Sequence, residues 1–307
     1  MTHTDRYLET PLHLRSLDTS LYNLGEQESI FLKQQTGIQD DEGLKEHILD
    51  LQAKAFAVYP YPCIRYFEWT SLKISRLFPY KDLLKLGAER EGAIFLEMGC
   101  CFGNDLRKAI ADGYPKENVV ATDLHQDFWN LGHELFKTTP ETFTVPFIAG
   151  NAFDATCLEI VQPFTKTLSP TTSRPTLTTL TTLNPLRGHV SAIHASAFFH
   201  LFNEEGQLHL ARAIAGLLSP EPGSMIFGRH GALPEKGLRP ASKGMEKTMF
   251  CHDPDSWREL WDGGVFEKGS VRVETTLEAL DESVSMKAFE MLEGAKFWLL
   301  TWKVTRL

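Results

Sequence analysis

The chain has 307 residues, 42% of them hydrophobic and 23% charged, with a formal net charge of −9. This balance is typical of a globular protein and argues against binding to a nucleic acid backbone, and the length suits one large α/β domain with an added cap or two small domains. No apolar run approaches the roughly 20 residues that span a bilayer, and the amino-terminal segment lacks a signal-peptide pattern. The five cysteines have no zinc-ligand spacing, so we expect reduced thiols, no metal site and a cytoplasmic protein.

Residues 1–90 are predicted to form an amino-terminal helical cap. A helix should begin after Asp40, whose side chain can cap it, and end before Pro60, because proline cannot continue a helix. We expect a second amphipathic helix over residues 65–77 and a short helix after Tyr80.

The pattern changes in residues 91–307, where short apolar runs alternate with helical segments. Such runs are typical of buried parallel strands, and the alternation predicts a sheet covered by helices on both faces. Strands are expected at 93–98, 118–123, 144–149, 189–194 and 225–228, and helices at 106–111, 126–136 and 204–218.

Two further segments complete the predicted fold. Residues 164–187 are rich in Thr, Ser and Pro and should form a mobile surface insertion. Residues 296–307 have a strong strand pattern and could pair antiparallel with 270–274. We therefore predict a Rossmann-like α/β fold with a mostly parallel sheet, an antiparallel carboxyl-terminal pair and a helical cap.

The first predicted strand ends in a glycine turn, Glu97-x-Gly99-x-x-x-Gly103. Glycines at such a turn allow a sharp bend and the close approach of a ligand. A dinucleotide fingerprint would need glycines where this chain has Cys101 and Asn104, so pyrophosphate binding is disfavoured. S-adenosylmethionine (SAM) has no phosphate, and its cationic methionine end suits a nearby carboxylate. The alternative is that the glycines only make a tight turn.

Polar residues at the next two strand ends favour an adenosine ligand. Asp123 can accept both hydroxyls of a ribose, with Leu124 against the adenine; its alternative role is to cap the next helix. Asn151 could pair with the adenine edge and Phe153 pack on its face, or the two could form only a turn and a core aromatic.

Longer strings carry a family resemblance. The segments YPYPCIRYF, LEMGCCFGNDLRKAIADGYPKENVVATDLHQDFWNLGHELF and SAIHASAFFHLF lie within residues 55–230. They resemble fungal specialised-metabolite methyltransferases, a class I SAM-dependent group that includes carboxyl O-methyltransferases of meroterpenoid biosynthesis. The resemblance implies SAM as cofactor, a small hydrophobic substrate and a homodimer. The expected cofactor-binding residues are Arg65, Glu97, Gly99, Cys100, Gly103, Asp105, Asp123, Leu124, Asn151, Ala152, Phe153 and His194.

Histidines are the candidate catalytic residues, because a hydroxyl acceptor needs a general base whereas an ionised carboxylate needs none. Ligands of parallel sheets bind at the carboxyl ends of the strands, where the fourth strand ends at His194. His200 and His230 are further candidates, and for each the alternative is a hydrogen-bonded structural histidine.

Cap residues could close over the acceptor and exclude water. Tyr59, Tyr61 and Trp69 are expected to contact it, with ordinary helix packing as the alternative. Arg65 could hold a carboxylate of SAM or of the acceptor, or form a surface salt bridge.

The sequence thus predicts O-methylation of a carboxylate or hydroxyl in a terpenoid- or polyketide-type compound. The alternatives are a SAM-binding cyclase or pseudo-methyltransferase without methyl transfer, and N- or C-methylation within the same fold.

Overall fold

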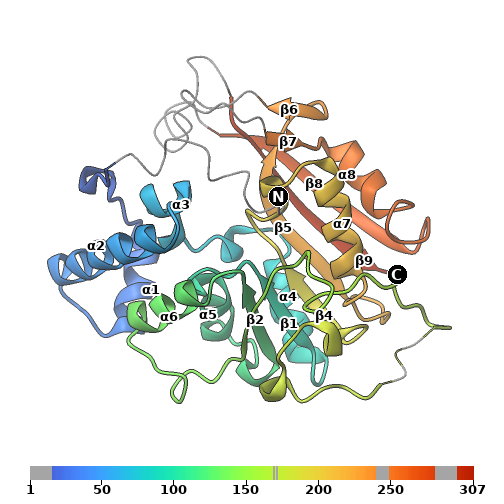
Figure 1. The fold of residues 1–307 in the computed structure, drawn as a ribbon, viewed down its shortest axis with the longest axis horizontal. Helices are drawn as coiled ribbons and strands as arrows, with labels where there is room; N and C mark the ends of the chain where they lie inside the picture. Colours follow the sequence, from blue (N-terminus) through green and yellow to red (C-terminus); the bar gives the residue numbers. More distant parts are fainter. Residues whose placement is uncertain (1–15, 169, 171, 240–248, 281–295) are drawn as a thin grey trace.

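The computed structural model describes residues 16–168, 170, 172–239, 249–280 and 296–307, and part of the predicted cap, residues 1–15, lies outside this set. A seven-stranded sheet forms the centre of the fold (Figure 1), in the order β3-β2-β1-β4-β5-β9-β8. Its strands are β1 (Ile94–Met98), β2 (Val119–Asp123), β3 (Phe147–Ala149), β4 (Val190–His194), β5 (Met225–Ala232), β8 (Val271–Ala279) and β9 (Trp298–Arg306).

The pairing confirms the predicted fold class. Strands β1 to β5 pair in parallel, while β9 is antiparallel to both β5 and β8. The order reverses between β1 and β4, and that crevice is where ligands of open parallel sheets bind. A small second sheet, which the sequence analysis did not predict, joins β6 (Gly237–Arg239) to β7 (Met249–Cys251).

Helices cover both faces of the sheet. One apolar cluster packs α7 (Glu204–Ala215) and α8 (Pro254–Trp261) against Leu96, Ile193 and Ile226. A second packs α4 (Tyr80–Glu89) and α5 (Asn104–Ala111) against residues of opposite parity, Phe95, Ala192 and Phe227. Successive side chains of a strand point to opposite faces, so parity decides on which face each site residue lies.

The cap lies beside one end of the sheet (Figure 1). Its helices are α1 (Glu26–Thr36), α2 (Asp41–Val58) and α3 (Pro62–Arg65), and α2 packs on α6 (Gln126–Leu135). As predicted, the Asp40 side chain caps α2 by accepting the Gly43 N–H at 2.7 Å. The predicted division into two domains at residue 90 stays a prediction.

The predicted helix over residues 65–77 is wrong. The chain instead forms α3 and two single-turn 3₁₀ helices, Glu68–Thr70 and Ile74–Arg76. Phe67 has a φ of 58°, a left-handed conformation that an α-helix cannot contain. The apolar spacing arises because these turns pack on the core, where Trp69 and Leu72 are buried.

The predicted surface insertion at 164–187 is surface only in part. Leu177, Leu183 and Leu186 are buried in the main core cluster. Arg174 ties the segment to the sheet by donating to Asn118 Oδ1 at 2.7 Å and to the Gly92 carbonyl. In the described residues, no helix is long and apolar enough to cross a membrane.

Two buried histidines should make stability depend on pH. Burial lowers the pKa of His252 to about 4 and that of His230 well below its ordinary value. An unfolded histidine binds a proton near pH 6.5 whereas these folded ones do not, so their contribution to stability is lost as pH falls through 6.5.

We expect His252→Gln to reduce the pH dependence of the unfolding free energy. For a folded pKa of about 4, the wild type should lose about 2 kcal/mol more than the variant between pH 7.5 and pH 5. Urea denaturation of both proteins at the two pH values measures the difference. Equal losses would show that the pKa of His252 is the same in the folded and the unfolded protein.

Candidate functional site

The turn after β1 is held in an unusual backbone conformation. Gly99, Cys101 and Gly103 have φ values of 66°, 50° and 77°. The Gly99 and Cys100 N–H groups both donate to the Thr122 carbonyl, at 2.9 and 3.1 Å. A Cβ on Gly99 would lie 3.0 Å from the Phe198 ring, and one on Gly103 would lie 2.9 Å from that of Trp129. Conformation and crowding therefore both require the two glycines.

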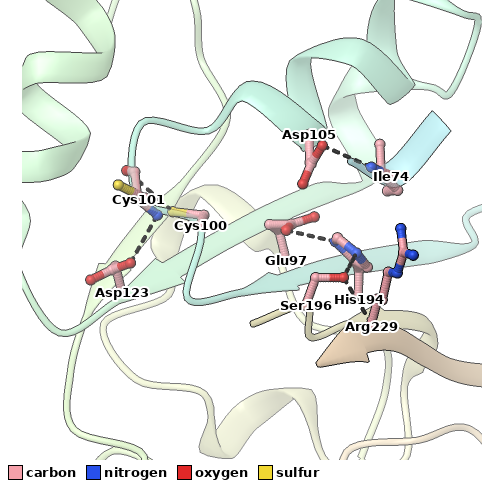
Figure 2. A network of polar contacts seen from close by, with 9 residues as sticks. All are labelled: Ile74, Glu97, Cys100, Cys101, Asp105, Asp123, His194, Ser196 and Arg229. Carbon is pink, nitrogen blue, oxygen red and sulfur yellow. Dashed lines mark hydrogen bonds and ion pairs between the residues drawn. The ribbon is translucent and has the colours of Figure 1, made fainter. Parts of the chain in front are cut away.

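Asp123 lies at the end of β2, beside this turn (Figure 2). Its Oδ2 accepts the Cys101 N–H at 2.8 Å, and its Oδ1 accepts the His125 N–H at 3.1 Å. A carboxylate oxygen can accept more than one hydrogen bond, so both oxygens can still bind a ligand hydroxyl. Leu124, the next residue, is an apolar side chain that remains 41% exposed beside Asp123.

A buried hydrogen-bonded chain joins β1 to β4 (Figure 2). Glu97 and His194 are direct partners in the parallel register and share one face of the sheet. His194 Nδ1 lies 2.7 Å from Glu97 Oε1, and its Nε2 lies 2.7 Å from the Ser196 hydroxyl. Ser196 Oγ also accepts a hydrogen bond from the backbone N–H of Arg229 at 3.1 Å. The chain runs from the strand interior to the loop after β4.

Glu97 and His194 each hold a proton more tightly than a solvated carboxyl or imidazole group does. Burial raises the pKa of Glu97 to about 7, although the charge and hydrogen bond of His194 oppose this. Burial alone would lower the pKa of His194, but the charge and hydrogen bond of Glu97 outweigh it, and the pKa is raised. The pair therefore takes up a proton at a higher pH than a solvated histidine does.

Two charged groups from other elements face this pair. Asp105, at the start of α5, accepts the Ile74 N–H at 2.9 Å. Asp105, Glu97 and His194 each place one ligand atom within 4.8 Å of the others. Because His194 Nδ1 is already bound to Glu97, the two carboxylates are what the cluster offers a cation. Lys73, from the cap, is close enough to lower the pKa of His194.

The segment after β3 forms a local turn that packs on the core. Asn151 Oδ1 accepts the Phe153 N–H at 3.0 Å in a local turn. The Phe153 ring stacks on His209, with centroids 4.9 Å apart, and Ala152 packs on the core. The Phe153 ring therefore contacts α7, and the expected adenine contacts of Asn151 and Phe153 stay predictions.

Of the other two candidate histidines, His230 lies on the opposite face of the sheet from the Glu97–His194 pair. His230 has the parity of Ile226 on β5, so it points to the opposite face from His194. It is 2% exposed and accepts the Trp302 indole N–H at 3.1 Å, with the Trp257 ring 4.6 Å away. These contacts make His230 a core residue. His200 accepts the Gly231 N–H at 3.3 Å, and burial lowers its pKa to about 4.

The cap aromatics divide into two groups. Trp69 is buried and stacks on Phe102, 4.4 Å between centroids, which places it in the core. Tyr59 and Tyr61 pack on His125, at 5.7 and 6.4 Å. The charge of Asp123 adds to the burial that raises the pKa of Tyr61.

Tyr59 and Tyr61 therefore lie on the Asp123 side of the site, and their expected contact with the acceptor stays a prediction. Arg65 donates to the Ser16 carbonyl at 2.7 Å. Cys100 is buried in the core cluster under the turn.

Three residues near this site were not among the predicted ones: Ser196, Lys73 and Phe198. Ser196 follows His194 by two residues, a spacing that could have drawn attention to a polar residue just beyond a strand end. Lys73 lies within residues 65–77, where a helix was wrongly predicted. Phe198 contacts Gly99 only through the packing of two distant segments, which no local pattern reveals.

Known proteins resemble the chain along most of its length. Residues 17–70 match the family model described as "Meroterpenoid methyltransferase N-terminal domain". The Asnovolin E/Chermesin D methyltransferase nvfJ of Aspergillus novofumigatus is 31% identical over 85% of this chain and 82% of its own. The O-methyltransferase phiE of a fungal species is 30% identical over 75% of this chain and 68% of its own.

Two further proteins also match most of the chain. The methyltransferase adrK of Penicillium roqueforti is 29% identical over 95% of this chain and 96% of its own. Among solved structures, the Burkholderia thailandensis 1,6-didemethyltoxoflavin-N1-methyltransferase covers 85% of this chain and 89% of its own, with 12% identity and a TM-score of 0.47.

Gly103 and Gly37 allow backbone strain to be separated from crowding. Their φ values are 77° and 74°, but a Cβ on Gly37 would have nothing within 4 Å. We expect Gly37→Ala to lower the unfolding free energy by about 1 kcal/mol through left-handed strain alone. Gly103→Ala should cost about 3 kcal/mol, because the Trp129 ring must also move. Urea denaturation measures both, and equal losses would contradict the crowding at Gly103.

Proposed function

The chain belongs to the family of fungal SAM-dependent methyltransferases of meroterpenoid-type pathways, and we propose that it methylates an oxygen of a small hydrophobic metabolite. The observation that carries the proposal is the meeting of three features at the carboxyl ends of the neighbouring strands β2, β1 and β4. These are the glycine turn, the Asp123 carboxylate and the Glu97–His194 pair.

The residues present suit the cofactor. Glu97 Oε2 is buried and has no hydrogen-bond partner among the described residues, so the α-ammonium group of SAM would supply a missing donor. Asp105 adds a second carboxylate near it, and Lys73 offers a cation to the α-carboxylate. Asp123 would accept the ribose hydroxyls, and the exposed Leu124 would pack on the adenine.

When bound, SAM supplies an electrophilic methyl group on a sulfonium. Methyl transfer is an in-line displacement, so the protein acts mainly by positioning the acceptor and excluding water. The loop after β4 would supply one wall, because Phe198 already lies against Gly99 at the turn. Tyr59 and Tyr61 would close the cofactor end instead of the acceptor end.

Oxygen is the favoured acceptor atom. One relative at 30% identity is named an O-methyltransferase, and the sequence resemblance includes carboxyl O-methyltransferases. We keep a carboxylate or hydroxyl of a terpenoid- or polyketide-type compound as the acceptor. A homodimer belongs to the same proposal on the resemblance alone, and sedimentation velocity would test it.

The proposed reaction is tested by product analysis. The purified protein is incubated with SAM and each of a panel of acceptors, comprising farnesoic acid, a farnesylated phenol and an aromatic polyketide acid. We expect S-adenosylhomocysteine together with a methyl ester or methyl ether, identified by mass spectrometry. Product without S-adenosylhomocysteine would indicate a cyclase, and methylation at nitrogen or carbon would exclude oxygen as the acceptor atom.

Asp123→Asn tests the cofactor site without any acceptor. Replacing one carboxylate oxygen by an amide removes a charged hydrogen-bond acceptor, so the dissociation constant of SAM should rise about 10-fold to 100-fold. Asp127→Asn, an exposed position in the first turn of α6, is the matched control and should bind SAM like the wild type. Isothermal titration calorimetry gives the constants, and unchanged binding in Asp123→Asn would remove this residue from the site.

A further inference from the structure

Ser196 is the least buried member of the hydrogen-bonded series Glu97–His194–Ser196. We propose that Ser196, His194 and Glu97 form a proton relay in which Ser196 takes the proton of the methyl acceptor and passes it to His194. The inference rests on the proposed methyl transfer and concerns how the acceptor oxygen is activated. It also narrows the acceptor to an oxygen that still carries its proton when it binds.

Burial decides which member of the chain can touch the acceptor. The His194 side chain is 0% exposed and that of Glu97 is 5% exposed. Ser196 is only partly buried and lies just beyond the carboxyl end of β4, where the acceptor is expected. A histidine closed off in this way cannot take a proton from a ligand directly, so the hydroxyl of Ser196 must stand between them.

The hydrogen bonds orient the serine for this role. A hydroxyl has one proton to donate and two lone pairs. Ser196 Oγ receives the Arg229 N–H at 3.1 Å, which occupies one lone pair. With Nδ1–H of His194 donated to Glu97, Nε2 carries a lone pair and accepts the Ser196 proton over 2.7 Å. The second lone pair of Oγ remains for the proton of the acceptor.

The step is balanced in atoms and charge. The acceptor O–H gives its proton to Ser196 Oγ while the Ser196 proton moves to His194 Nε2. The imidazolium that results is stabilised by the Glu97 carboxylate through the Nδ1–H bond. The acceptor oxygen bonds to the methyl carbon, and the electron pair of the broken S–C bond stays on sulfur as a neutral thioether.

Charges around His194 give the relay a pH dependence. Glu97 on β1 and Asp105 on α5 raise its pKa, and Lys73 of the cap lowers it. The net direction is upward, and the relay works only while Nε2 is unprotonated. The rate should therefore fall as the pH drops through a pKa above the ordinary histidine value of about 6.5.

The test compares three serine variants, with the panel acceptor that gives the most S-adenosylhomocysteine as the probe. Ser196→Ala should lower kcat about 100-fold, as expected for loss of general-base assistance, with KM and SAM affinity within twofold of wild type. Its pH profile should lose the acid limb. Ser196→Thr keeps the hydroxyl and should recover most of the rate. Ser191→Ala, a buried serine at the other end of β4, should match the wild type in rate and profile.

Different results would contradict the proposed methyl transfer and the proposed proton relay. A wild type that binds SAM and forms no S-adenosylhomocysteine with any acceptor contradicts the proposed methyl transfer. A wild type that methylates its acceptor, alongside Ser196→Ala with kcat within threefold and the same acid limb, overturns the relay alone. Equal losses in Ser196→Ala and Ser196→Thr would also overturn it, since a packing defect and not the hydroxyl would then be responsible.

Discussion

Glu97 is a carboxylate at the end of a strand whose five residues are all buried, and its desolvation is the constraint on which the site depends. A buried carboxylate is stable only with compensating hydrogen bonds, and His194 supplies one of them on the neighbouring strand. That contact requires β1 and β4 to be adjacent and in their observed register. The strand order therefore creates both the point at which such sheets bind ligands and the buried Glu97–His194 pair beside it.

Strand parity then places two histidines, His194 and His230, on opposite faces of the sheet, and their pKa values are shifted in opposite directions. His194 shares its face with Glu97 and is held ready to take up a proton. His230, on the other face, lies among tryptophan rings and stays neutral. One sheet thus places an ionisable pair on the face covered by α4 and α5, and an apolar, uncharged layer on the face covered by α7 and α8.

The sheet and its acidic strand ends could be predicted because apolar runs, glycines and terminal carboxylates are local signals. The helix predicted over 65–77 failed because one residue, Phe67, adopts a left-handed conformation that residue type does not reveal. The Glu97–His194 contact joins positions 97 residues apart, so only the register could show it. The sequence favoured His194 because it ends the fourth strand, but parity and burial were needed to place His230 in the core.

The place of β9 in the sheet has a consequence for synthesis on the ribosome. Among the described strands of the main sheet, β8 pairs with β9 alone, and β9 fills the gap between β8 and β5. Strands β1 to β5 can pair as they emerge, but β5 keeps an open edge until β9 has been made. Open edges attract other chains. The nascent protein therefore passes through a stage at which the edge of β5 is open to pairing with other chains.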